Sequence, residues 1–172
     1  MMKRPPGAPP PPSAGPIAVR PAGAADAHAL SKLLASAFPE QVWDGARVHK
    51  ELLDAADVAV TYVIDEGGRP VATASVRYVE RFPDSGYVHW VAVDPRHRGQ
   101  RLGTVVMETV IRRFLADGRE SAILETDDVR LPAIASYLGQ GFIPHYSDVD
   151  HEDRWSAVFS HLARSRRAAR NK

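Results

Sequence analysis

Hydrophobic residues follow two kinds of pattern along this chain, one typical of helices and one typical of strands, and segments of the two kinds are interspersed. Apolar residues at helical spacing predict four amphipathic helices, over residues 26–37, 41–53, 105–118 and 131–140. Strand-like apolar runs lie before, between and after them, at residues 17–20, 58–64, 71–79, 87–93, 122–126, 142–143 and 155–159. This order predicts an α/β (α+β) domain, in which about four helices flank both faces of a mixed central sheet of about six to seven strands.

Two of these strands are adjacent and are joined by a glycine-containing turn. The segment Asp65–Arg69 carries Gly67 and Gly68, and paired glycines supply the positive φ that tight turns require. The pattern therefore predicts a β-hairpin. The next run, residues 87–93, is apolar on both faces, which is typical of a central strand.

The ends of the chain differ in composition from its middle. Residues 1–16 hold seven of the fourteen prolines, which predicts a disordered, proline-rich head. Residues 164–172 carry five basic side chains and no acid, so we expect a basic tail. Residues 17–163 then form one domain. Neither a signal-peptide pattern nor an apolar run of membrane-spanning length is present, and we expect no membrane association.

Charge and cysteine content narrow the function classes. The net charge of the chain is +1, but residues 17–163 alone carry −6. A negative domain disfavours nucleic-acid partners and attracts cationic small molecules. No cysteine is present, which excludes disulfides and a thiol nucleophile, and we expect a cytoplasmic protein.

The segment from His89 to Thr104 is the richest in candidate chemistry. A buried strand ends at Asp94-Pro95 and continues into a basic, glycine-containing loop that begins a helix. Free backbone amides at a helix start favour anions. The segment fits neither the phosphate loop of nucleotide hydrolases nor the dinucleotide fingerprint. A plain connection with charged residues in water is the alternative.

This segment resembles the acetyl-coenzyme A motif of the GNAT superfamily of N-acetyltransferases. Val91-Ala92-Val93, Pro95 and the loop Arg98-Gly99-Gln100-Arg101-Leu102-Gly103 match its pattern, except that Arg101 replaces a glycine. If that position requires positive φ, the arginine hinders close backbone approach to a pyrophosphate. If it lies in the first helical turn, it adds a phosphate contact.

A second segment is similar to the late helix of the same family. Residues 133–142 read A-x-x-x-Y-x-x-x-G-F around Tyr137, but Arg130 stands where the family often has an asparagine. The resemblance implies splayed central strands and acetyl-coenzyme A as cosubstrate. The residues that it assigns to cosubstrate binding are Val91, Ala92, Val93, Arg98, Gly99, Gln100, Arg101, Leu102, Gly103, Thr104, Arg130 and Tyr137.

The resemblance also implies roles in catalysis. The Val91 amide would stabilise the oxyanion as an amine attacks, and Tyr137 would be the general acid. A core aromatic is the alternative for Tyr137. His89, on the same strand face as Val91, is the candidate base, and a structural histidine within the sheet is its alternative. Glu125 is a second candidate base.

These expectations converge on an N-acetyltransferase that acts on a primary amine, with a small molecule favoured over a protein. The first two helices, with Phe38 and Trp43, and the loop 143–154 are expected to form the acceptor pocket. That loop is acidic but lacks regular metal-ligand spacing, so we expect no metal. The alternatives are a non-catalytic coenzyme A sensor or interaction module, and acetylation of a protein or aminoacyl-RNA. A homodimer is compatible with all of them.

Overall fold

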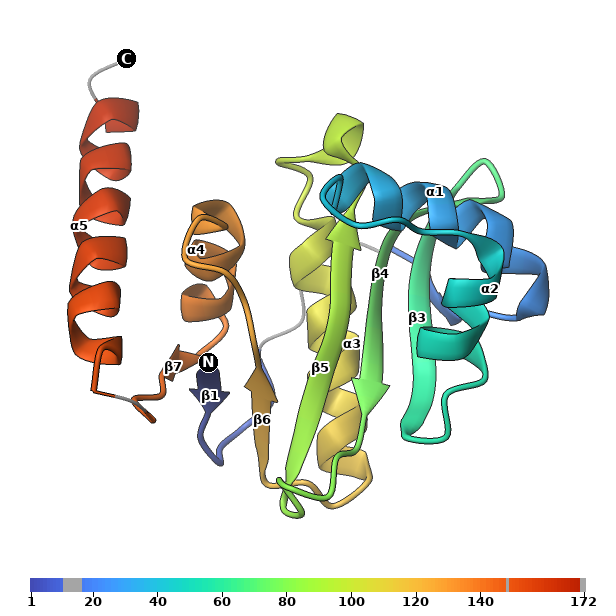
Figure 1. Ribbon diagram of the computed structural model, residues 1–172, viewed down its shortest axis with the longest axis horizontal. Helices are drawn as coiled ribbons and strands as arrows, with labels where there is room; N and C mark the ends of the chain where they lie inside the picture. Colours follow the sequence, from blue (N-terminus) through green and yellow to red (C-terminus); the bar gives the residue numbers. More distant parts are fainter. Residues whose placement is uncertain (11–16, 148, 171–172) are drawn as a thin grey trace.

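The computed structural model describes residues 1–10, 17–147 and 149–170 and shows an open mixed sheet of seven strands with five helices (Figure 1). The strand order across the sheet is β2-β3-β4-β5-β6-β1-β7. The strands are β1 (Met2–Arg4), β2 (Val19–Pro21), β3 (Val58–Glu66), β4 (Arg69–Arg77), β5 (Ser85–Val93), β6 (Ser121–Leu124) and β7 (Ile143–Pro144). The predicted fold class is confirmed.

Helices cover both faces of the sheet. The five helices are α1 (Ala27–Ala37), α2 (Gly45–Val48), α3 (Leu102–Ala116), α4 (Leu131–Gly139) and α5 (His151–Arg170). Helices α1 and α2 lie on one face of the large strands and α3 on the other (Figure 1). Two apolar clusters result, one between the sheet and α3 and one between the sheet and α1–α2.

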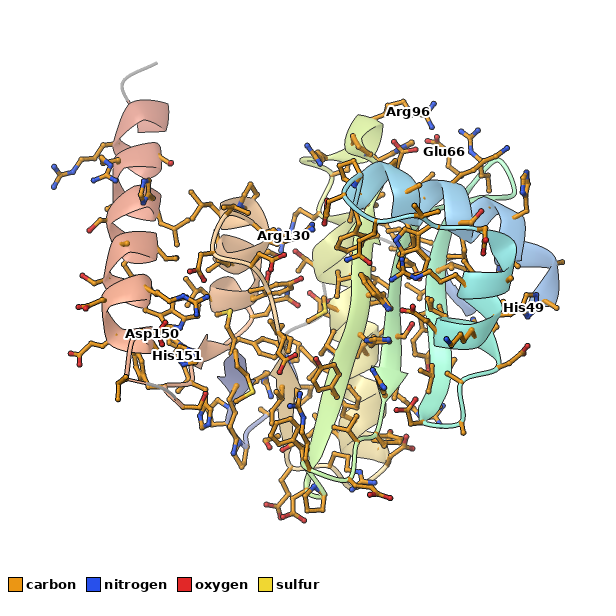
Figure 2. The ribbon with its side chains drawn as sticks, in the orientation of Figure 1. His49, Glu66, Arg96, Arg130, Asp150 and His151 are labelled. Carbon is orange, nitrogen blue, oxygen red and sulfur yellow. The ribbon has the colours of Figure 1, made fainter. Side chains whose placement is uncertain are left out.

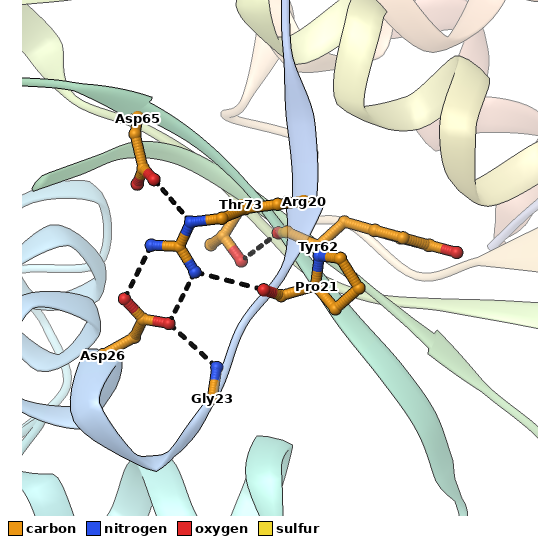
Figure 3. Close-up of polar contacts among 7 residues, drawn as sticks. All are labelled: Arg20, Pro21, Gly23, Asp26, Tyr62, Asp65 and Thr73. Carbon is orange, nitrogen blue, oxygen red and sulfur yellow. Dashed lines mark hydrogen bonds and ion pairs between the residues drawn. The ribbon is translucent and has the colours of Figure 1, made fainter. Parts of the chain in front are cut away.

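The predicted hairpin is confirmed as β3 and β4, which pair antiparallel. Gly67 and Gly68 have φ of 58° and 77° in the turn between them. The edge strand β2 is tied to its surroundings by Arg20. Its guanidinium donates two hydrogen bonds of 2.8 Å to Asp26, at the start of α1, and one to Asp65 of β3 (Figure 3). This ion pair lowers the pKa of Asp26.

The central strands are splayed, as the resemblance implied. Strands β5 and β6 are parallel, but they pair only from Ser85–Ser121 to Tyr87–Ile123. Beyond Tyr87, β5 continues for six residues to Val93, while β6 ends at Leu124. The two strands therefore separate at their carboxyl ends and leave a cleft.

Two expectations about the ends of the chain are wrong within the described residues. Met2–Arg4 of the expected disordered head forms β1, which pairs with both β6 and β7. The expected last strand, residues 155–159, is part of α5, because Trp155, Val158 and Leu162 recur at helical spacing and are buried. Helix α5 also continues through 164–170 of the expected tail. Residues 11–16 of the head and 171–172 of the tail lie outside the described residues.

None of the helices described here is both long and apolar enough to cross a membrane.

Candidate functional site

A cleft of about 350 Å³ opens where β5 and β6 separate. Its walls come from β5, from the segment that follows β6, from α4 and from the segment that follows α1. The lining residues are Phe38, Gln41, Tyr87, Val88, His89, Trp90, Val91, Leu124, Glu125, Thr126, Asp127, Arg130, Ala133 and Tyr137.

The β5 wall presents free backbone groups. The amide of Asp94 donates to the Val71 carbonyl in β4 at 2.8 Å. Because successive peptide groups of a strand point to opposite edges, those of Val91 and Val93 point away from β4, toward the cleft. No strand pairs with this edge in the part of the chain that the structure describes. Val91 and Val93 can therefore hydrogen-bond a ligand.

Trp90 interrupts the regular pairing of β5. Its φ is 46°, which is strained for a non-glycine residue, and the register between β4 and β5 shifts there. The side chain packs edge-on against Phe38 and Trp43, at centroid distances of 5.0 and 4.7 Å, and its indole N–H donates to Glu51 at 3.0 Å. The first two helices thus hold one aromatic wall of the cleft, with Phe38 in its lining and Trp43 behind Trp90.

His89 lines the cleft but is mostly buried. Burial, together with the positive charge of Arg77, lowers its pKa to about 4. The imidazole is therefore neutral at neutral pH. With so low a pKa it is too weak a base to accept the proton of the attacking amine efficiently. This environment weakens the expectation that His89 is the base.

Tyr137 reaches the cleft from α4 and is largely buried. Burial raises the pKa of its phenol to about 12. The hydroxyl is therefore protonated at neutral pH, the state that a general acid needs. The centroid of its ring also lies 6.1 Å from that of Phe142 in the core. The side chain of Tyr137 therefore both packs in the core and lines the cleft.

Glu125 follows β6 on the wall opposite Val91. The Tyr87 hydroxyl donates to one carboxylate oxygen at 2.9 Å, and Arg81 donates to the other at 2.8 Å. Burial and the nearby carboxylate raise the pKa of Tyr87 to about 12. The half-exposed side chain of Glu125 is thus held by two hydrogen bonds next to the point where β5 and β6 separate.

Arg130 spans the mouth of the cleft. Its guanidinium forms ion pairs with Glu40, after α1, and with Asp127, after β6, and lies 4.4 Å from the centroid of the Phe38 ring. Figure 2 shows Arg130 pointing from α4 toward the β5 side of the molecule. The residue expected to contact a cosubstrate is instead paired with acids, and it links the two walls.

The predicted anion loop lies at the carboxyl end of β5. Asp94 caps the short helical turn Pro95–His97 by accepting the Arg96 amide at 2.9 Å. Hydrogen bonds from Arg96 keep the pKa of Asp94 well below its usual range. His97 contacts Glu66 of the β3–β4 hairpin at 2.7 Å, and Figure 2 shows Glu66 and Arg96 at this end of the sheet. The loop is therefore fixed to the hairpin.

The start of α3 resolves the alternatives for Arg101. It is the residue before the helix and adopts left-handed φ and ψ of 61° and 13°, while Gly99 has φ of 80°. The position therefore does require the conformation that glycine favours. Gly103 follows in the first turn, where an added Cβ would lie 3.4 Å from Val93.

The arginines of this loop are available to a ligand. Arg98 and Arg101 are exposed and form no ion pair within the described ranges. Exposed guanidiniums beside a helix start and free strand amides match the diphosphate and amide groups of a coenzyme A thioester. The residues present fit acetyl-coenzyme A.

Other predicted residues lie elsewhere. None of the described residues of the loop 143–154 lines the cleft, so the structure does not bring this loop to the expected acceptor pocket. Over the described ranges, no three His, Asp or Glu side chains gather as metal ligands would. Conversely, sequence reasoning gives no role to Gln41, Tyr87 or Asp127, which line the cleft. Alternation along the predicted strand places Tyr87 on the face of His89 and Val91, but the sequence does not indicate its contact with Glu125.

Comparison with known proteins identifies this architecture. A family model described as the acetyltransferase (GNAT) family matches residues 27–142. N-acetyltransferase 8B of Rattus norvegicus is 29% identical over 102 residues, which are 52% of this chain and 46% of that protein. The chain thus spans less than half the length of this curated relative.

Solved structures show the same fold at low identity. The ribosomal-protein-S18-alanine N-acetyltransferase of Escherichia coli matches with a TM-score of 0.64 and 21% identity, over 75% of this chain and 79% of that one. A GNAT acetyltransferase of Novosphingobium aromaticivorans matches with a TM-score of 0.63 and 22% identity, over 84% and 59%.

A mixed sheet whose central strands separate, with helices on both faces, is the architecture of an acetyltransferase fold. This chain belongs to the GNAT acetyltransferase family.

Proposed function

We propose that this protein transfers an acetyl group from acetyl-coenzyme A to a primary amine of a small molecule, by direct attack of the amine on the thioester. The observation that carries the proposal is the cleft itself. Val91, on the unpaired backbone edge of β5, and Tyr137 of α4 both line it, and the loop that follows β5 leads into the start of α3.

Each wall supplies one part of the reaction. The Val91 amide donates a hydrogen bond to the thioester oxygen as negative charge develops there. Loss of such a hydrogen bond raises the activation barrier of acyl transfer by about 3 kcal/mol. The protonated phenol of Tyr137 donates its proton to the leaving sulfur as the carbon–sulfur bond breaks. Arg98 and the amides at the start of α3 bind the phosphates.

The acceptor side is the aromatic and acidic part of the cleft. Phe38 and Trp90 offer apolar surface, and Glu125 offers a carboxylate held by Tyr87 and Arg81. Such a wall favours a cationic amine with an apolar body. With His89 neutral, we assign to Glu125 the binding of the ammonium group and the passage of its proton to solvent.

The test is the release of coenzyme A from acetyl-coenzyme A, measured over a panel of small primary amines. Tyr137→Phe should lower kcat at least tenfold, because the leaving thiolate loses its proton donor, while the Kd for acetyl-coenzyme A changes less than twofold. Tyr146→Phe is the matched control, since Tyr146 is exposed and lies outside the cleft.

Full turnover in Tyr137→Phe would contradict the assignment of Tyr137 as the general acid. Tight binding of acetyl-coenzyme A with no turnover on small amines or on protein N-termini would favour a coenzyme A-binding sensor. Turnover on protein N-termini alone would support acetyl transfer by direct attack but would show that the acceptor is a protein and not a small molecule.

A further inference from the structure

A three-residue strand lies in the middle of one half of the sheet. Strand β1 pairs antiparallel with β6 on one side and with β7 on the other. In Figure 1 it lies between them, at the end of the sheet that carries α4 and α5. Among the described residues, β6 and β7 do not pair with each other, and only β1 connects them within the sheet.

The register places this strand at the branch point of the cleft. Lys3 pairs with Ile123, which is also the last residue of β6 that pairs with β5. One position further, Leu124 pairs with Met2 and has no partner in β5. The segment that follows, Glu125–Asp127, lines the cleft. At the level of the cleft, β6 is therefore held by Met2 on one side and by no strand on the other.

The same segment holds the end of α4. The Arg4 guanidinium donates to the Gln140 carbonyl, which follows α4, at 3.1 Å, and the Met1 carbonyl accepts the His145 amide, after β7, at 3.1 Å. Met2 is fully buried, in the same apolar cluster as Tyr137 and Leu124. One short segment thus fixes both ends of the β6–α4–β7 unit that carries Tyr137.

We propose that Met2–Arg4 is a positioning strand for catalysis. The slot between β6 and β7 is a binding site for an extended segment with one buried apolar side chain, and filling it aligns Glu125 and Tyr137 with the β5 wall. The anion loop belongs to β5 and α3, so phosphate binding does not depend on the slot. The catalytic part of this proposal rests on the proposed function, but the existence of the strand site does not.

The first test compares two full-length variants. Met2→Asp places a carboxylate in the core and prevents the strand from filling the slot, whereas Lys32→Asp introduces the same side chain at an exposed position of α1, outside the slot and the cleft. Met2→Asp should lower kcat at least tenfold with less than threefold change in the Kd for acetyl-coenzyme A, and Lys32→Asp should change neither by more than twofold. Should Met2→Asp not fold, Met2→Ala and Lys32→Ala make the same comparison, because alanine retains the backbone pairing of β1.

The second test has a readout independent of turnover. A fluorescent peptide of residues 1–10 should bind the full-length Met2→Asp or Met2→Ala chain, as measured by anisotropy, and should restore its kcat, whereas the same peptide with Met2→Asp should do neither. Equal kcat in the Met2 and Lys32 variants would overturn the positioning role. A folded Met2 variant that does not bind the peptide would overturn the strand site. Peptide binding with no turnover even in the unaltered chain would retain the strand site and reject the proposed function.

Discussion

At the scale of single residues, Arg101 carries backbone strain that a glycine would remove. Its left-handed conformation, with φ of 61°, is unfavourable for a non-glycine residue by roughly 1 kcal/mol. Glycine also increases the conformational freedom of the unfolded chain, which offsets part of this gain. We therefore expect Arg101→Gly to raise the free energy of unfolding by roughly 0.5 kcal/mol. Arg98→Gly removes the same charge at φ of −63° and should lower it by a similar amount. Urea denaturation measures both, and destabilisation by both changes alike would contradict the strain at Arg101.

His89 makes a second prediction at this scale, on pH. Its pKa is about 4 in the folded protein and about 6.5 in an unfolded chain. Between these values the unfolded state binds more protons, so the free energy of unfolding falls as the pH falls. The loss should reach about 2 kcal/mol at pH 5 relative to pH 7.5. Urea titrations of the protein and of His89→Gln should differ in this slope by that amount, and identical slopes would disprove the buried neutral imidazole.

At the scale of elements, local pattern predicted most of the fold and failed at the two ends for physical reasons. The hairpin, the central strand and the helices before and after it depend on periodicity and turn residues that are close in sequence. Strand β1 depends on partners more than a hundred residues away, and its three residues precede the first proline of the head. The short run Trp155–Phe159 predicts a strand when it is taken alone, whereas the helical spacing of the buried Trp155, Val158 and Leu162 extends beyond it into α5.

The candidate site divides in the same way. Sequence motifs located the anion loop and Tyr137, whose residues are contiguous or regularly spaced. They could not locate the pairing of Glu125 with Tyr87 or of Arg130 with Glu40, because each pair joins separate elements. Such pairs decide which groups in the cleft are free to bind a ligand.

At the scale of the whole molecule, two halves meet at the splayed strands. One half holds the anion loop, β5 and the first helices, and the other holds β1, β6, α4, β7 and α5. Strands β5 and β6 join them through three residue pairs, supplemented by side-chain contacts such as Arg130–Glu40. A ligand that touches the anion loop, the β5 edge and Tyr137 bridges both halves, so its binding should be coupled to the stability of the entire chain.

Acetyl-coenzyme A should therefore raise the melting temperature. At roughly a hundredfold excess over Kd, binding to the folded state alone contributes about 2.7 kcal/mol, which corresponds to about 5–10 °C for a domain of this size. Arg98→Ala should reduce the shift at a fixed ligand concentration, because it removes a phosphate contact. Arg69→Ala should leave the shift unchanged, since Arg69 is also exposed but is the first residue of β4, outside the predicted anion loop. Pantetheine, which lacks the diphosphate, should give a smaller shift that does not depend on Arg98. An acetyl-coenzyme A shift that is equal in the two arginine variants would mean that the phosphates bind elsewhere, and no shift at all would mean that the strained Arg101 and the paired Arg130 close this cleft to coenzyme A.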